Sequence, residues 1–169
     1  ALESSFLIDA EYLASSLLPK DLDLRKLYLA AYPLEGQTKP RAQAAFLQRF
    51  NEGALYLTYV GHGNPDVLAH ERMFVVSRDL TQIHNGRRLP LMYTAASQVG
   101  VFDDPLRVSM PEALLRRAEG GVIAMICATR VGYHDSNMLL ANQVHRELFR
   151  GQTRQVPVGL ALQTAKRKV

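Results

Sequence analysis

Two short turns in the sequence carry side chains that could do chemistry together. Residues 61–64 read Gly-His-Gly-Asn, and residues 96–100 read Ala-Ser-Gln-Val-Gly. The imidazole of His62 can act as a general base, and the hydroxyl of Ser97 can act as a nucleophile that such a base activates. The glycines let a substrate backbone approach and leave the Gly63 N–H group to donate to an oxyanion. If the two turns meet in the fold, they form a nucleophile–base dyad for acyl transfer.

Each turn also has a simpler interpretation. Taken alone, the Gly-His-Gly segment can be a tight turn with an incidental histidine, and a serine after a strand can be an ordinary cap or turn residue. The position of the two turns favours chemistry, because each follows a short apolar run, at residues 54–60 and 89–95. Such runs predict strands that are buried on both faces of a parallel sheet. Functional groups collect beyond the carboxyl ends of such strands, where both turns lie.

Short apolar runs alternate with longer amphipathic segments, which predicts an α/β domain with a largely parallel sheet. Two further strands are expected at residues 26–31 and 121–127. Pro40 can open a helix at its first turn, and Ser109 with Glu112 has the spacing of a capping box. The expected helices span residues 8–17, 40–53, 109–120, 135–149 and 160–168.

The composition indicates one globular domain with its own core. The chain has 169 residues, a formal net charge of +4, and 47% hydrophobic residues. No apolar run approaches the ~18 residues of a membrane span, so no transmembrane segment is expected. A nucleic-acid partner is not expected either, because the basic residues are scattered and lack the interleaved aromatics of a binding stripe.

The remaining reactive side chains have weaker patterns. The single cysteine, Cys127, stands at the end of a predicted strand, where a buried and inert thiol is expected. No metal site and no cofactor are predicted, because the histidines lack metal-ligand spacing and the chain has no nucleotide-binding motif. The other four histidines are expected at the surface: His70, His84, His134 and His145.

The segment between the two turns is long for a connection. Residues 64–88 are expected to hold a small insertion or a loop that covers the substrate. Glu71 and Arg72 could contribute to binding there, or they could form a solvated charge pair.

The ordered motifs resemble one known family along nearly the whole chain. Residues 59–64, 94–100, 102–105 and 109–112 together are similar to the gingipain-type cysteine peptidases, most of all to the PorU-like sortases of the type IX secretion system. This resemblance implies a caspase-like fold, a three-layer α/β sandwich whose mostly parallel sheet is flanked by helices. It also implies that residues 1–169 are a fragment of a gingipain-like peptidase domain, its C-terminal portion, with further strands and domains upstream.

The resemblance also implies roles for individual residues. His62 matches the catalytic histidine, Gly63 matches an oxyanion-hole glycine, and the backbone amide at position 97 is the second oxyanion donor. Residues 129–133 match a loop that shapes the specificity pocket. The candidate substrate-binding residues are Asn64, Ala95, Gln98, Thr129, Arg130 and Tyr133.

Position 97 departs from the family pattern, since the family has its nucleophilic cysteine where this chain has Ser97. A thiol ionises near neutral pH, whereas a serine hydroxyl needs a well-placed base that a third group orients. No carboxylate can be assigned that third role by spacing alone, and Asp103 and Asp104 fit a turn equally well. Three explanations stay open: an engineered Cys-to-Ser substitution, a naturally inactive homologue, or a natural serine nucleophile.

The resemblance finally implies a function and a place. The activity would be cysteine-type endopeptidase or sortase cleavage of C-terminal sorting signals from secreted proteins, with Ser97 making this form inactive. The partners would be a polypeptide substrate and other secretion-machinery proteins, at the outer membrane surface or outside a Gram-negative cell. The alternative is a non-catalytic domain that binds peptides or acts as a scaffold within the secretion system.

Overall fold

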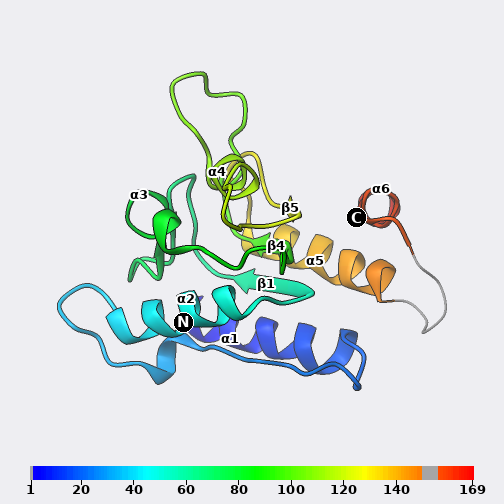
Figure 1. Ribbon diagram of the computed structural model, residues 1–169. Helices are drawn as coiled ribbons and strands as arrows, with labels where there is room; N and C mark the ends of the chain where they lie inside the picture. Colours follow the sequence, from blue (N-terminus) through cyan, green and yellow to red (C-terminus); the bar gives the residue numbers. More distant parts are fainter. Residues whose placement is uncertain (1, 150–155) are drawn as a thin grey trace. The chain divides into compact units, whose positions relative to one another are not determined.

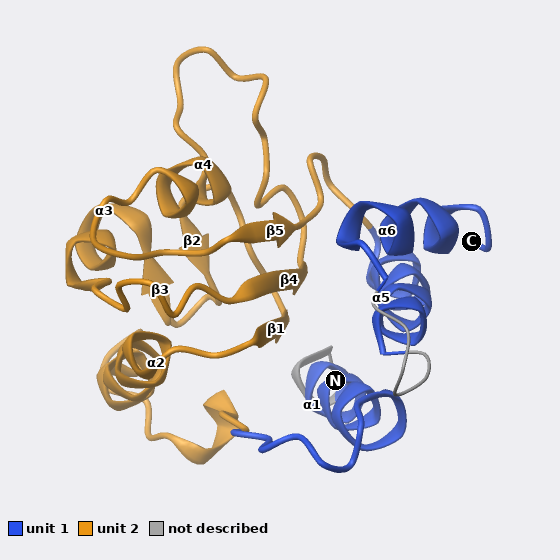
Figure 2. Ribbon diagram, turned by 45° about the vertical axis from the view of Figure 1, so that its right-hand side comes forward, with its two compact units in different colours: residues 1–25, 133–169 blue, residues 26–132 orange. Residues whose placement is uncertain are grey.

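The computed structural model describes residues 2–149 and 156–169, which fall into two compact units (Figure 2). The sheet unit is Lys26–Gly132, and the helical unit is Ala1–Arg25 together with Tyr133–Val169. The sheet unit contains both turns singled out in the sequence.

A three-stranded parallel sheet forms the centre of the sheet unit. Its strands are β1 (Tyr56–Val60), β4 (Leu91–Ala95) and β5 (Ala124–Ile126), in the order β1-β4-β5. Figure 2 shows the three strands side by side and running in the same direction. The predicted parallel sheet is therefore confirmed, and β4 is its central strand.

Two helices with predicted caps flank this sheet. Helix α2 (Pro40–Glu52) has its proline in the first turn and ends where the Gly53 amide donates to the Phe50 carbonyl. Helix α4 (Met110–Leu115) begins with the predicted capping box, in which the Ser109 amide and hydroxyl both donate to the Glu112 carboxylate. These hydrogen bonds lower the pKa of Glu112. Both helices contribute to one apolar core, which includes Phe46, Phe50, Met92, Met110 and Leu114.

Two of the predicted strands differ from the structure. The strand expected at 26–31 is wrong: residues Leu29–Ala31 form a 3-10 turn, and this segment pairs with no strand in the described part of the sheet. The strand expected at 121–127 is shorter, because Gly121 has φ +105°, and a Cβ there would lie 1.9 Å from the Leu114 carbonyl oxygen. The chain is therefore still turning at Gly121 and becomes extended only at Ala124.

The segment between the two turns folds against the core. It contains a hairpin of β2 (Val67–Leu68) and β3 (Phe74–Val75), followed by helix α3 (Val76–Asp79) and a 3-10 turn at Leu80–Gln82. Its apolar side chains, including Leu68, Phe74 and Ile83, are fully buried in the core. The hairpin is thus part of the packed unit.

The helical unit consists of α1 (Leu2–Tyr12), a π-helical continuation at Leu13–Leu17, α5 (His134–Leu148) and α6 (Val158–Lys166) (Figure 1). These positions confirm the three helices expected near both ends of the sequence. Across the described residues, no helix combines the length and hydropathy needed to span a membrane.

One histidine of this unit corrects a prediction. His145 was expected at the surface, but it is fully buried on the inner face of α5. Its Nδ1 lies 2.7 Å from the Ala141 carbonyl oxygen, so Nδ1 carries the ring proton and donates it there. Burial lowers the pKa of His145 to about 4 and keeps the ring neutral.

Candidate functional site

The carboxyl ends of β1 and β4 lie next to each other. Val60 is paired with Ala95, and the Gly61 amide donates to the Ala95 carbonyl at 3.3 Å. His62 and Ser97 each follow these paired residues by two positions, so the sheet brings the two turns to one edge. A dyad between the two turns requires their strands to be neighbours, and β1 and β4 are.

Two hydrogen bonds to the His62 carbonyl hold this turn in place. The His62 carbonyl accepts from the Tyr59 hydroxyl at 2.7 Å and from the Ala69 amide at 2.9 Å. Burial raises the pKa of Tyr59 far above its ordinary value, so this phenol stays protonated and donates. The imidazole is exposed, and the edge of one ring meets the face of the other between His62 and His70, with centroids 4.4 Å apart.

The Ser97 side chain is bonded to the loop that follows β5. Its hydroxyl donates to the Gly132 carbonyl at 2.9 Å and accepts from the Gly132 amide at 3.3 Å. The Gln98 amide also donates to the Arg130 carbonyl, at 3.1 Å. The Ser97 turn and residues 128–132 are therefore joined along their length, and Ser97 is half-buried between them.

The Gly63 and Ser97 amides make no hydrogen bond within the described parts of the chain, so both remain available as donors. The two turns that carry them also pack closely. A Cβ on Gly63 would lie 2.9 Å from Val99 Cγ2 and 3.0 Å from Ala96 Cβ, which leaves room only for glycine. Two available N–H donors on turns in contact with each other could together form an oxyanion hole.

The substrate-binding candidates fall into different surroundings. The Asn64 side-chain oxygen accepts from the Asp66 and Val67 amides, both at 2.8 Å, so this residue shapes its own turn. Ala95 is buried in the sheet, and Thr129 is exposed. Tyr133 is exposed and begins the helical unit.

Gln98 and Arg130 lie together at an open hollow of about 400 Å³ beside the Ser97 turn. The Arg130 guanidinium forms a two-pronged ion pair with Asp103, at 2.5 and 3.0 Å, and this pair lowers the pKa of Asp103. After the Ser97 turn, the chain forms a long loop that contains Asp103 and leads to α4 (Figure 1). The hollow is lined by Pro65, Gln98, Val101, Asp103, Asp104, Arg107 and Arg130.

Sequence comparison assigns the chain to a family. Residues 7–169 match Peptidase family C25. The chain belongs to peptidase family C25. The assignment agrees with the gingipain-type resemblance and makes this a cysteine-peptidase-like domain. No curated protein sequence matches the chain significantly.

Two solved structures share the fold of this C25 chain. One is the Arg-specific cysteine proteinase gingipain R (RgpB), with a TM-score of 0.64 and 21% identity over 79% of this chain. The other is the complex of RgpB pro- and mature domains from Porphyromonas gingivalis, with a TM-score of 0.60 and the same identity and coverage. The predicted caspase-like fold is thereby confirmed. The match covers 32% of each of those chains, so the C25 chain spans about a third of their length.

Two residues beside the candidate dyad had no signal in the sequence. His70 is exposed, as predicted, and its ring also contacts the His62 ring. Gly132 fell inside the predicted pocket loop, but its bonds to Ser97 had no sequence signal because 35 residues separate the two. The described residues contain no group of three His, Cys, Asp or Glu side chains placed to hold a metal ion.

The Cys127 thiol is not placed to replace a C25 nucleophile. It is half-buried behind the Ser97 turn, where a Cβ on Gly100 would lie 2.5 Å from its sulfur. Burial raises the pKa of this thiol to about 11, which leaves little thiolate at neutral pH.

We therefore expect iodoacetamide to alkylate Cys127 of the folded protein at pH 7.5 about 10²-fold more slowly than a free cysteine. The rate should climb as the pH is raised toward 11, because thiolate accumulates. Mass spectrometry of the alkylated protein measures both rates, and the urea-unfolded protein provides the fast reference. Rapid, complete alkylation of the folded protein at pH 7.5 would show that Cys127 is an accessible, ionised thiol after all.

Proposed function

We propose that this C25 chain supplies the dyad of a peptide-cleaving site that binds an extended polypeptide across the carboxyl ends of β1 and β4. The observation that carries the proposal is the pairing of Val60 with Ala95, because it brings the His62 and Ser97 turns together. The uncommitted amides of Gly63 and Ser97 support it further.

The proposed reaction uses a cysteine thiolate at position 97. The thiolate attacks the scissile carbonyl, and the electron pair of the C=O bond moves to an oxyanion that accepts from the two amides. The oxyanion collapses and the C–N bond breaks while protonated His62 gives its proton to the leaving amine. Neutral His62 then takes a proton from water as the water oxygen attacks the thioester carbonyl. The C–S bond breaks, which releases the acid and regenerates the thiolate beside protonated His62.

We further propose that the substrates are C-terminal sorting signals of secreted proteins, processed at the outer membrane surface with partners of the type IX secretion machinery. Support for this comes from the resemblance of residues 59–64 and 94–105 to the PorU-like sortases. The candidate pocket is the hollow between the Ser97 turn and Arg130, whose charged rim would meet the peptide.

Serine at position 97 should leave this form with little or no turnover. The Ser97 hydroxyl has a single proton, and that proton is donated to the Gly132 carbonyl. A base at His62 would first have to draw the hydroxyl away from the loop, and it would still face a weak nucleophile.

The same hydrogen bonds favour a second candidate function, a non-catalytic domain that binds peptides within a secretion complex. In that case Ser97 serves to close the loop after β5 over the site. Peptide binding would then survive replacement of His62, because no proton transfer is needed.

The deciding experiment introduces a thiol at position 97. We expect the Ser97→Cys variant to cleave peptides that the serine form binds without cleaving, as followed by mass spectrometry of a peptide mixture. The serine form, treated identically, is the matched control. A folded Ser97→Cys variant that binds peptides and cleaves none would contradict the peptidase proposal and support the non-catalytic alternative.

A further inference from the structure

A second histidine lies against the proposed catalytic one. The rings of His62 and His70 meet at an interplanar angle of 65°, with their centroids 4.4 Å apart. This is the edge-to-face arrangement in which aromatic rings attract each other. His70 comes from the tip of the β2–β3 hairpin, residues 69–72.

The hairpin tip is tied directly to the His62 backbone. The Ala69 amide donates to the His62 carbonyl, and the Arg72 amide closes the tip by donating to the Ala69 carbonyl at 3.1 Å. Ala69 and Arg72 both have positive φ, +66° and +56°. Non-glycine residues adopt this conformation at a cost that surrounding contacts must offset, so the tip has one defined shape.

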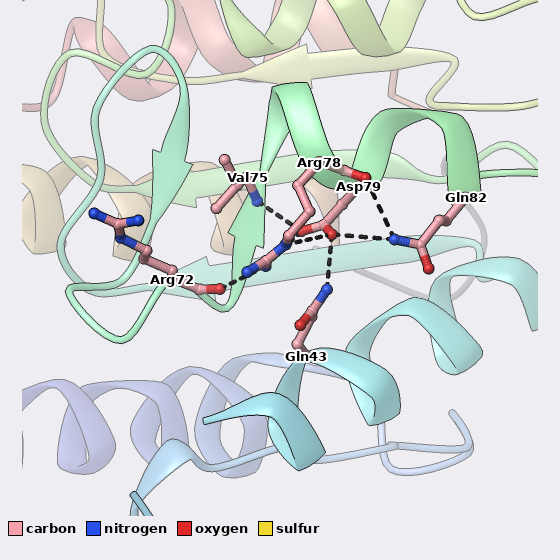
Figure 3. Close-up of polar contacts among 6 residues, drawn as sticks. All are labelled: Gln43, Arg72, Val75, Arg78, Asp79 and Gln82. Carbon is pink, nitrogen blue, oxygen red and sulfur yellow. Dashed lines mark hydrogen bonds and ion pairs between the residues drawn. The ribbon is translucent and has the colours of Figure 1, made fainter. Parts of the chain in front are cut away.

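A buried ionic network anchors the far side of the tip (Figure 3). The Arg78 guanidinium donates to the Arg72 carbonyl at 2.8 Å and to both carboxylate oxygens of Asp79. Asp79 is fully buried and also accepts from the Val75 amide and from Gln43 of α2. The network therefore fixes the strand that leaves the tip onto both α2 and α3.

A second anchor lies beside the tip. The Lys39 ammonium is 3.6 Å from the Glu71 carboxylate, and both side chains are largely buried. Lys39 is itself held, because it donates to the Leu29 carbonyl at 2.8 Å. His70 thus stands on a backbone that is fixed before it, after it and alongside it.

We propose that His70 is a positioning residue that holds the His62 imidazole in one orientation. An exposed imidazole has several side-chain rotamers open to it, and a neighbouring ring on a fixed backbone disfavours those that clash with it or lose the contact. Proton transfer to a leaving amine depends on ring orientation. The catalytic part of this inference rests on the proposed function, but the orientation of the ring does not.

The test compares three replacements of His70. His70→Ala and His70→Gln remove the ring, His70→Phe keeps an edge-to-face ring without imidazole chemistry, and His84→Ala is the matched control at another histidine of the same unit. NMR of labelled protein reports the His62 side-chain couplings and its contacts to the ring at position 70. We expect the Ala and Gln variants to average the His62 couplings, and the Phe variant and control to keep them.

Kinetics in the Ser97→Cys background give the second readout. The Ala and Gln variants should lower kcat about tenfold with KM nearly unchanged, and Phe should restore kcat. His62 couplings that stay fixed in both the Ala and Gln variants would overturn the inference, and so would loss of order in the Phe variant. If the Ser97→Cys protein has no activity at all, the proposed function fails, while the NMR result still decides the role of His70.

Discussion

In the Ser97→Cys background, replacing His62 by alanine should lower the rate of peptide hydrolysis by about 10²–10⁴-fold, the usual contribution of one general acid–base residue. His62 is the imidazole that the pairing of Val60 with Ala95 brings to the Ser97 turn. Without it, the thiol has no base and the leaving amine has no acid. The loss should fall mainly on kcat, because the turn that binds the peptide backbone is unchanged.

Initial rates of peptide cleavage over a range of substrate concentrations measure this effect, with His84→Ala in the same background as the control. That histidine lies in the segment before β4 and has no part in the proposed reaction. Equal rates for the two variants would remove His62 from the mechanism. The site would then need another proton carrier, and the family resemblance at this turn would be only structural.

Replacing Asp79 by alanine should lower the free energy of unfolding by about 2–4 kcal/mol. The carboxylate is fully buried and accepts hydrogen bonds from Arg78, Gln43 and the Val75 amide. Alanine would leave these donors facing a small cavity with no acceptor. The loss should also loosen the hairpin, so amide exchange at residues 69–75 should accelerate more than exchange in β4.

Urea unfolding followed by circular dichroism measures the change, and Glu35→Gln is the control. Glu35 also pairs with an arginine, Arg41, but at 3.7 Å and in solvent. Exposed pairs of this kind contribute about 0–1 kcal/mol, so the control should unfold close to the original midpoint. Similar midpoints for both variants would mean that the buried network adds nothing to stability.

The parts of the site that the sequence could predict are those set by local rules. Two apolar runs, each followed by a glycine-containing turn, are enough to place His62 and Ser97 at strand ends. Pro40 and the Ser109–Glu112 spacing predict where two flanking helices begin, since these signals act within a single helical turn. Each of these inferences needs no knowledge of what lies across the fold.

The parts that could not be predicted depend on contacts between distant residues. Residues 26–31 have a strand-like composition but no neighbouring strand among the described residues, so they form no ladder. His70 meets His62 from a hairpin tip in which Ala69 and Arg72 adopt positive φ, which their residue types disfavour. The polarity of histidine favours an exposed position. His145 is buried all the same, because its face of α5 is covered by other residues.

The two hydrogen bonds between Ser97 and Gly132 have a consequence for how such a site can evolve. One side-chain atom at position 97 serves two exclusive purposes: it can fasten the loop after β5, or it can attack a carbonyl. Serine holds the loop better, because oxygen forms shorter and stronger hydrogen bonds than sulfur. Cysteine is the better nucleophile. A single Cys–Ser exchange therefore replaces peptide cleavage by a more stable loop beside the site. A lineage can retain a protein with this loop for peptide binding alone.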